Sequence, residues 1–394
     1  MNNMYVCENL RTPFASIGGF LSRINPKLVG SLMIHRILEK NSSLNSDMID
    51  ELLIGNILGS NLGSDFATQV IRTSKLNDDI ERGMINCGHI TGLKLVDYTV
   101  KSLTEGPSVI AAMAIENISS APNYIPNARV KDAIEGDVPT LNGVLRDAYY
   151  VDEIKNFAGQ LAETVIKKGK LTRKNIDNYV LESIGKTKAA AEAGKFANEI
   201  CKVKIDIKDG ADFIFTEDTE YKRYDETPDI TTLDPSFQKD GLLTLASSAR
   251  SADGGSVALI ANEEAVKKYG LKPSARISGY SEVYGKAEDY VKSGANAAKN
   301  ALKQGGVKLA EVDFFELHED FASTPLLFSK SLKISKDKLN RNGGSLGVGN
   351  PISSTGLRLV NSVCNQFDQN GGTKAVATLC GPSGGSAALL LEKV

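Results

Sequence analysis

Residues 342–358 read Asn-Gly-Gly-Ser-Leu-Gly-Val-Gly-Asn-Pro-Ile-Ser-Ser-Thr-Gly-Leu-Arg, and the remainder of the chain can be interpreted around them. So many glycines in so few residues are typical of a backbone that turns tightly and passes close to another segment. After Gly356 apolar residues recur at helical spacing as far as Phe367, and Gly371-Gly372 supplies a stop. The sequence therefore predicts a glycine-rich loop that leads into a buried helix.

Two further strand ends flank this loop in the sequence. Upstream, residues 312–315 have the pattern of a short apolar strand. It leads into Glu-Leu-His-Glu-Asp-Phe-Ala at 316–322, in which a histidine is followed directly by two carboxylates. Downstream, residues 375–380 have the pattern of a buried strand that runs into a glycine-rich turn. Three strand-to-loop corners therefore carry His318, Asn350 and Cys380.

These corners resemble the C-terminal half of the thiolase family, which has N-E-A-F or H-E-A-F, then N-G-G with G-H-P-I-G-A-S-G, then C-x-G-G-G. Residues 11–14 (Arg-Thr-Pro-Phe), 91–94 (Thr-Gly-Leu-Lys) and 116–122 resemble motifs of its N-terminal half. The resemblance covers nearly the full length and is weakest between about 125 and 240. It implies an α/β fold with a thiolase-like, duplicated five-layered α/β/α/β/α core and an inserted loop domain.

The pattern along the chain agrees with this arrangement. Apolar strands alternate with amphipathic helices in the first part, for example a helix at 28–40 and a strand at 109–114, and the same layering returns after about 246. Between these parts, residues 150–168 and 173–196 are charged, helix-prone segments. We therefore expect an N-terminal thiolase half at 1–120, a loop domain at 121–245 and a C-terminal thiolase half at 246–394.

The composition excludes several classes of partner. A net charge of −2 and a pI near 6.1 give no basic surface for nucleic acid. No apolar run approaches the ~20 residues that cross a bilayer, and the first residues lack the features of a signal peptide, so we expect a cytoplasmic protein without a membrane partner. The five cysteines are scattered without metal-ligand spacing, which predicts free thiols and no metal site.

Thiolase chemistry requires a thiolate that accepts an acyl group, a base that deprotonates the α-carbon of a second thioester, and donors for the developing oxyanions. In the family the nucleophile stands at a helix amino end in C-x-S/T-G-L-K, and the resemblance places His89 at that position. The positive helix end disfavours imidazolium, so we expect a neutral ring. Cys87 lies two residues earlier, ~7 Å away on an extended chain, and would need a local bulge to act as the nucleophile.

Two more positions depart from the family pattern. Asn350 stands where the family has the histidine that activates the nucleophile; an amide is no base, but its NH2 group can donate to a carbonyl oxygen. Pro382 stands where a glycine donates its backbone NH to an oxyanion, and losing such a donor typically costs ~3 kcal/mol of transition-state stabilisation.

Two positions retain candidate groups. Cys380 matches the family's second catalytic cysteine, and His318 matches the H-E-x-F variant. If the folds coincide, His89, His318, Asn350 and Cys380 meet in one pocket. Without the resemblance, Cys380 would be interpreted as a buried core thiol and His318 as a hydrogen-bonded residue at a strand end.

The coenzyme A contacts also differ from the family. Residues 246–249 (Ala-Ser-Ser-Ala) align with G-N-A-S, so Ser247 and Ser248 are the candidate contacts of the pantetheine arm, displaced by one residue or lost. The family's H-M in the loop domain aligns with Phe157-Ala158. The resemblance implies a coenzyme A thioester as substrate and no tightly bound cofactor.

The leading hypothesis is a thiolase-superfamily acyltransferase that acts on acyl-CoA or a related small-molecule thioester. Cys380 would be the thiol, His89 or His318 the base, and the Asn350 amide the carbonyl donor. The alternative is a catalytically silent thiolase-like subunit that binds a ligand or supports an active thiolase partner. A third hypothesis is a hydrolase or condensing enzyme that uses the same pocket. Thiolases generally form dimers or tetramers, so we expect a homodimer or homotetramer.

Overall fold

The computed structural model describes residues 3–40, 43–103, 106–129, 137–205, 213–226, 229–382 and 385–394. It contains a large mixed sheet with the strand order β14-β15-β16-β13-β1-β12-β5-β3-β4. One end of the sheet is formed by β1 (Met4–Arg11), β3 (Glu51–Gly55), β4 (Glu81–Ile85), β5 (Val109–Glu116) and β12 (Ala252–Asn262). The other end is formed by β13 (Ala275–Tyr284), β14 (Phe314–Leu317), β15 (Lys374–Cys380) and β16 (Gly385–Lys393).

The two ends of the sheet repeat one pairing pattern. In the first, β3 pairs parallel with β4 and β5, and β5, β12 and β1 then pair antiparallel. In the second, β14 pairs parallel with β15, and β15, β16 and β13 then pair antiparallel. Only residues 4–6 of β1 and 275–277 of β13 join the two ends. This repetition agrees with the expected duplication.

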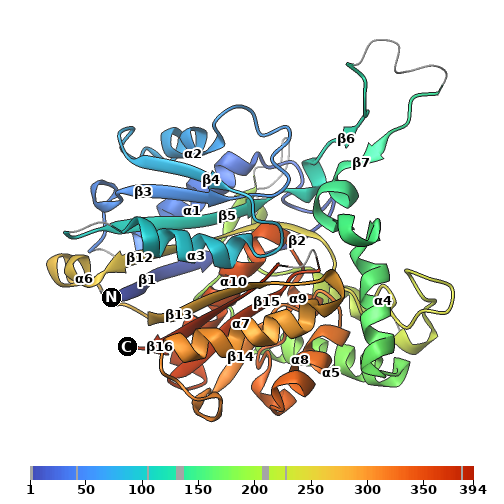
Figure 1. The fold of residues 1–394 in the computed structure, drawn as a ribbon. Helices are drawn as coiled ribbons and strands as arrows, with labels where there is room; N and C mark the ends of the chain where they lie inside the picture. The colour runs from blue at the N-terminus through green and yellow to red at the C-terminus, as the bar shows by residue number, and fades with distance from the viewer. Residues whose placement is uncertain are drawn as a thin grey trace.

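The helices lie in three layers around the two ends of the sheet (Figure 1). Helices α3 (Thr91–Ser102) and α10 (Thr355–Gln369) share the central core with both ends. Helices α1 (Pro26–Lys40) and α2 (Phe66–Ser74) cover the outer face of the first end. Helices α7 (Tyr290–Gln304) and α8 (Ser323–Leu332) cover the outer face of the second. The α/β fold with five layers is therefore confirmed.

Alternation along the strands decides which helices each side chain meets. In β5, Ile110 and Ala112 point to the central helices, whereas Val109 and Ala111 point to α1 and α2. In β15, Ala375, Ala377 and Leu379 point to the central helices, whereas Val376 and Cys380 belong to the core around α7. Cys380 is therefore on the outer face of its strand.

The segment between β5 and β12 carries α4 (Ala158–Gly169) and α5 (Arg173–Glu192), which share the core around α7 and α8. The pattern at 150–168 predicted one helix, and this was wrong for its first part. There β8 (Tyr150–Val151) and β9 (Asn156–Phe157) pair as a short hairpin, so the helix begins only at Ala158. The predicted strand at 312–315 likewise lies slightly later, as β14.

A buried ion-pair cluster ties the first strand to the inserted segment. The Arg11 guanidinium donates to Glu199 at 2.8 Å and, through both terminal nitrogens, to Asp218 at 2.7 and 2.8 Å. The backbone NH of Phe14 also donates to Asp218, at 2.7 Å. Removing one partner of a buried ion pair destabilises a protein strongly, because the other charge is left buried and unpaired. The cluster therefore holds β1 and the inserted segment in a fixed position relative to each other.

Candidate active site

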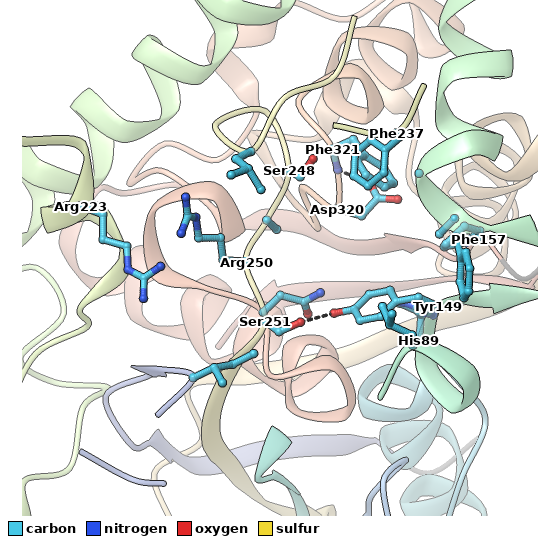
Figure 2. A pocket seen from close by; sticks show the side chains of 18 residues that line it. His89, Tyr149, Phe157, Arg223, Phe237, Ser248, Arg250, Ser251, Asp320 and Phe321 are labelled. Carbon is cyan, nitrogen blue, oxygen red and sulfur yellow. Dashed lines mark hydrogen bonds between the residues drawn. The ribbon is translucent and has the colours of Figure 1, made fainter. Parts of the chain in front are cut away.

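A pocket of about 430 Å³ lies where the two halves and the inserted segment meet (Figure 2). His89 and Ile17 come from the first half, and Asp320, Asn350 and Pro382 from the second. The inserted segment adds most of the apolar surface. The apolar lining residues are Ile17, Leu145, Phe157, Phe237, Leu245 and Phe321. A pocket with mostly apolar sides and a few polar groups is typical of small-molecule sites.

His89 lies immediately before α3, and its side chain is buried. Its ring centroid is 5.9 Å from that of Tyr149, whose hydroxyl shares a 2.6 Å hydrogen bond with Ser251 (Figure 2). Burial lowers the pKa of His89 to about 4. The ring is therefore neutral near pH 7 and has one nitrogen that can accept a proton.

His318 lies behind the pocket and is not among the residues that line it. Its Nδ1 atom shares a 2.8 Å hydrogen bond with the Ser345 hydroxyl, which also accepts a 2.9 Å bond from Arg358. Its Nε2 atom is buried without a partner among the described residues. Burial, and then the charges on His89 and Arg358, hold the pKa of His318 well below its usual range.

Asn350 lines the pocket with a fixed amide. Its backbone NH donates to Arg250 at 2.8 Å, and its Oδ1 atom accepts a 2.8 Å hydrogen bond from the Thr355 hydroxyl. Since the oxygen is occupied, the NH2 group is the part of the amide that is available to a ligand. A free NH2 group fits the role predicted for Asn350, which is to donate a hydrogen bond to a carbonyl oxygen. Pro382 also lines the pocket, and it has no NH to donate.

Cys380 does not line the pocket. Its side chain is fully buried, and its sulfur faces Gly294 of α7 so closely that a Cβ atom at 294 would lie 2.2 Å away. Burial, and then the charge of Asp320, hold the pKa of the Cys380 thiol well above its usual range. In this position the thiol is in its neutral form, which is a weak nucleophile.

Cys87 does not line the pocket either. The chain before α3 is not extended, because Gly88 has a positive φ of 59°. The charges nearest to the Cys87 thiol are Lys94 and Glu282, and burial raises its pKa. The described residues that line the pocket thus include no cysteine.

The two carboxylates that follow His318 had no role predicted from the sequence. Glu319 is a structural group, because it accepts hydrogen bonds of 2.7 to 3.1 Å from Tyr179, Ser183, Asn340 and Leu346. Asp320 instead lines the pocket. Its Oδ1 atom accepts a 2.9 Å bond from the Phe321 NH, and its Oδ2 atom is buried without a partner among the described residues. Burial raises its pKa to about 7.

The two serine candidates separate in the structure. Ser247 is fully buried, and its hydroxyl accepts a 2.7 Å bond from the NH of Thr244 within a turn. Ser248 lines the pocket and donates to the Thr244 carbonyl at 3.0 Å. Arg223 and Arg250 lie on the same side of the pocket as Ser248, away from Phe157 (Figure 2). This side therefore carries cationic groups suited to an anionic part of a ligand.

Across the described ranges, no three His, Cys, Asp or Glu side chains are grouped so that they could hold a metal ion. In the same part of the chain, the helices are too short or too polar to span a membrane.

Comparison with known proteins gives a consistent result. Residues 4–264 match the thiolase N-terminal domain and residues 271–393 the thiolase C-terminal domain. Acetyl-CoA acetyltransferase IB of Candida tropicalis is 30% identical over 394 residues, covering 99% of this chain and 97% of that protein. A probable acetyl-CoA acetyltransferase of Dictyostelium discoideum is 32% identical over 397 residues, covering 100% and 95%.

Solved structures are similar over the whole chain. The acetyl-CoA acetyltransferase of Bacillus anthracis has a TM-score of 0.92 at 25% identity, covering 100% of this chain and 99% of that one. The Acat5 thiolase of Ascaris suum, in complex with coenzyme A, has a TM-score of 0.90 at 27% identity and covers 100% of both chains.

Proposed function

The chain belongs to the thiolase family, and from this we propose that it is an acyltransferase of the thiolase type that acts on acyl-CoA or a related thioester with a non-standard active site. One observation carries the proposal. His89, Asn350 and Pro382 stand at three positions that match catalytic positions of the family, and all three line one pocket. This grouping supports the proposal, because the sequence resemblance gives these three positions catalytic roles in the family.

Within this function, Asn350 supplies the NH2 group that polarises a thioester carbonyl, and neutral His89, with His318 behind it, supplies a proton acceptor. The sequence resemblance matches Cys380 to the family's second catalytic cysteine, and in this proposal Cys380 is the thiol that accepts the acyl group. Its sulfur faces α7 in the structure, so this step requires the thiol to reach the pocket.

A coenzyme A thioester fits the two sides of the pocket. The phosphates of coenzyme A are anionic, and Arg223, Arg250 and Ser248 lie on one side of the pocket. The acyl end is apolar, and Phe157, Phe237 and Phe321 are available to it. The Ascaris suum relative, which holds coenzyme A, supports the same ligand class.

The test is incubation with acetyl-CoA, followed by product analysis and peptide mass mapping. Formation of a carbon–carbon bond, with an acetyl group on Cys380, supports the proposal. Release of free coenzyme A without carbon–carbon bond formation indicates a hydrolase instead. An unmodified Cys380 with no product counts against acyl transfer.

A second candidate is a catalytically silent thiolase-like subunit. The observation that favours it is the absence of a cysteine among the described residues that line the pocket. Such a subunit would bind acetyl-CoA in calorimetry without converting it, and it would co-purify with a thiolase that has the complete Cys and His set.

We also propose that the protein is a homodimer joined through β4. This strand ends the sheet, only β3 pairs with it among the described strands, and Met84 on it is 46% exposed. An unpaired edge strand with an exposed apolar residue is a ready surface for pairing with a second copy. Sedimentation analysis of the wild type should give a dimer, and Met84→Lys should weaken it. The control Leu181→Lys, at a 56% exposed site on α5, should leave the dimer intact. A monomeric wild-type protein would exclude it.

A further inference from the structure

Two carboxylates follow His318, and the structure gives them opposite environments. Glu319 holds α5 and the glycine-rich loop together through its four donors, so its charge is already compensated. Asp320 is 7% exposed; its Oδ1 atom accepts a bond from the Phe321 NH, and its Oδ2 atom has no partner within hydrogen-bonding geometry among the described residues. Burial raises the pKa of this carboxyl, and the nearby Thr324 hydroxyl offsets that rise only in part. A buried carboxylate with an unpaired oxygen and no cationic partner costs several kcal/mol unless it takes up a proton. A carboxyl at position 320 therefore does not stabilise the folded protein.

Asp320 is also the carboxyl group that faces the ligand space. It lies between Phe157 on one side and Phe237 and Phe321 on the other, in the apolar part of the pocket (Figure 2). The two arginines that line the pocket, Arg223 and Arg250, lie on its far side from Asp320 (Figure 2). Under the proposed function, the acyl end of a thioester occupies this apolar part.

We propose that Asp320, and not a cysteine thiol, is the catalytic base that removes a proton from the carbon next to the thioester carbonyl. This inference rests on the proposed function, because the thioester must occupy the pocket. In the step, the C–H bond breaks and the proton goes to Asp320 Oδ2. The C–H electron pair forms the C=C bond of an enolate, and the carbonyl π electrons move to the oxygen. The Asn350 NH2 group donates to that oxygen, and no oxidant or cofactor is needed.

The surroundings of Asp320 suit this role near neutral pH. Burial raises its pKa to about 7, and a base works best when its pKa is close to the working pH. Tyr290 of α7 and Cys380 of β15 face Asp320, and the pKa values of both lie well above their usual ranges, so both stay protonated. In the pocket itself His89 is neutral.

Competing bases are less well placed or weaker. His89 lines the pocket, but burial lowers its pKa to about 4, so it accepts a proton near neutral pH less readily than Asp320 does. Cys380 is fully buried behind Asp320 and does not line the pocket. Glu116 and Glu316, whose pKa values burial also raises to about 7, do not line it either. Asp320 is thus the carboxyl group among the described residues of the pocket that a substrate carbon can contact.

The test measures release of tritium from methyl-tritiated acetyl-CoA into water, together with acetyl-CoA binding by calorimetry. Asp320→Asn should bind acetyl-CoA like the wild type and release tritium at least ~100-fold more slowly. Asp253→Asn is the control, since Asp253 is also buried with a raised pKa but lies outside this pocket, and it should release tritium at the wild-type rate. Wild-type release should rise with pH and level off above about 7, which tests the inference even if Asp320→Asn does not fold.

Each other outcome overturns the inference. Equal tritium release by Asp320→Asn, or a wild-type rate that keeps rising into the range where thiols ionise, would place the base elsewhere. Wild-type protein that binds acetyl-CoA without releasing tritium would refute the role of Asp320 and leave thioester binding intact. Wild-type protein that does not bind acetyl-CoA would refute the proposed function, and the inference with it.

Discussion

Gly356 of α10 lies against Gly92 of α3 so closely that a Cβ atom added at either position would lie 2.8 Å from the Cα atom of the other. The backbones of the two helices touch at their amino ends, where no side chain fits between them. This contact determines where the preceding loops lie. It thereby brings His89, before α3, and Asn350, before α10, to the same pocket.

Gly356→Ala should destabilise the protein by about 3 kcal/mol or more. The added Cβ would lie 2.4 Å from the Leu93 backbone nitrogen, and backbone cannot move aside as a flexible side chain can. Urea unfolding followed by circular dichroism measures the change.

The matched control is Gly185→Ala in the middle of α5, where an added Cβ meets no atom within 4 Å. There the substitution should stabilise by about 0.5–1 kcal/mol, because alanine loses less conformational freedom in a helix. Equal effects of the two substitutions would mean that the helices are not in contact at Gly92 and Gly356.

The glycines at 342–358 predicted that this loop passes close to another segment, and the family resemblance implied that the segment before α3 meets it. The sequence could not predict the direction of Cys380. Alternation in β15 gives no signal, since the strand is apolar on both faces between two helix layers. The family match places Cys380 by position along the chain and leaves its side-chain direction to the packing against Gly294.

The difference between Glu319 and Asp320 was equally hidden in the sequence. Both are carboxylates at one strand end, and the residues that compensate Glu319 include Tyr179 and Ser183, far away in the inserted segment. Only the folded chain shows which carboxylate has donors. The hairpin at 150–157 was missed for a related reason, because its pairs are two residues long and leave no periodic pattern.

Thiol labelling checks the placement of the cysteines. Cys87 is partly exposed, whereas Cys7, Cys201, Cys364 and Cys380 are each at most 7% exposed. Burial also raises the pKa of Cys7, Cys201 and Cys364 to about 12, so these thiols do not ionise readily. A disulfide reagent should therefore label one thiol of the native protein, and Cys87→Ser should abolish that labelling. Native labelling of Cys380 would show that its sulfur reaches the pocket rather than α7.

Asp320→Asn should change the pH dependence of stability in a defined direction. The unfolded aspartate has a pKa of ~3.9, and the folded one about 7. Below pH ~4 the Asp320 carboxyl is protonated in both the folded and the unfolded state, and the contribution of this proton to stability is fully present. As the pH rises toward 7, the unfolded state loses the proton first, so this contribution is lost. The variant should therefore gain stability over the wild type with rising pH, on the order of 4 kcal/mol at pH ~8.

The comparison for this prediction is Asp152→Asn, at a fully exposed site. Lys155, through a hydrogen bond and its charge, lowers the pKa of Asp152, so its small contribution has the opposite sign and appears as the pH rises. Thermal unfolding resolves the two trends, between pH ~4 and ~8 for Asp320 and below pH ~4 for Asp152. A pH-independent difference between Asp320→Asn and the wild type would show that the carboxyl is solvated.

His89→Cys tests whether position 89 is the acyl-accepting position of the site. A thiol there would line the pocket at the positive end of α3, which favours the thiolate, next to the Asn350 amide. In a Cys87→Ser background, the new thiol at position 89 should accept the acetyl group of acetyl-CoA, and peptide mass mapping detects this. Adding Asn350→His should make the acetylation roughly 100-fold faster, because the imidazole supplies a base. The control is His35→Cys on the exposed side of α1, which should react with iodoacetamide and gain no acetyl group. If both new cysteines react alike with iodoacetamide and neither is acetylated, the pocket does not present a thioester to position 89.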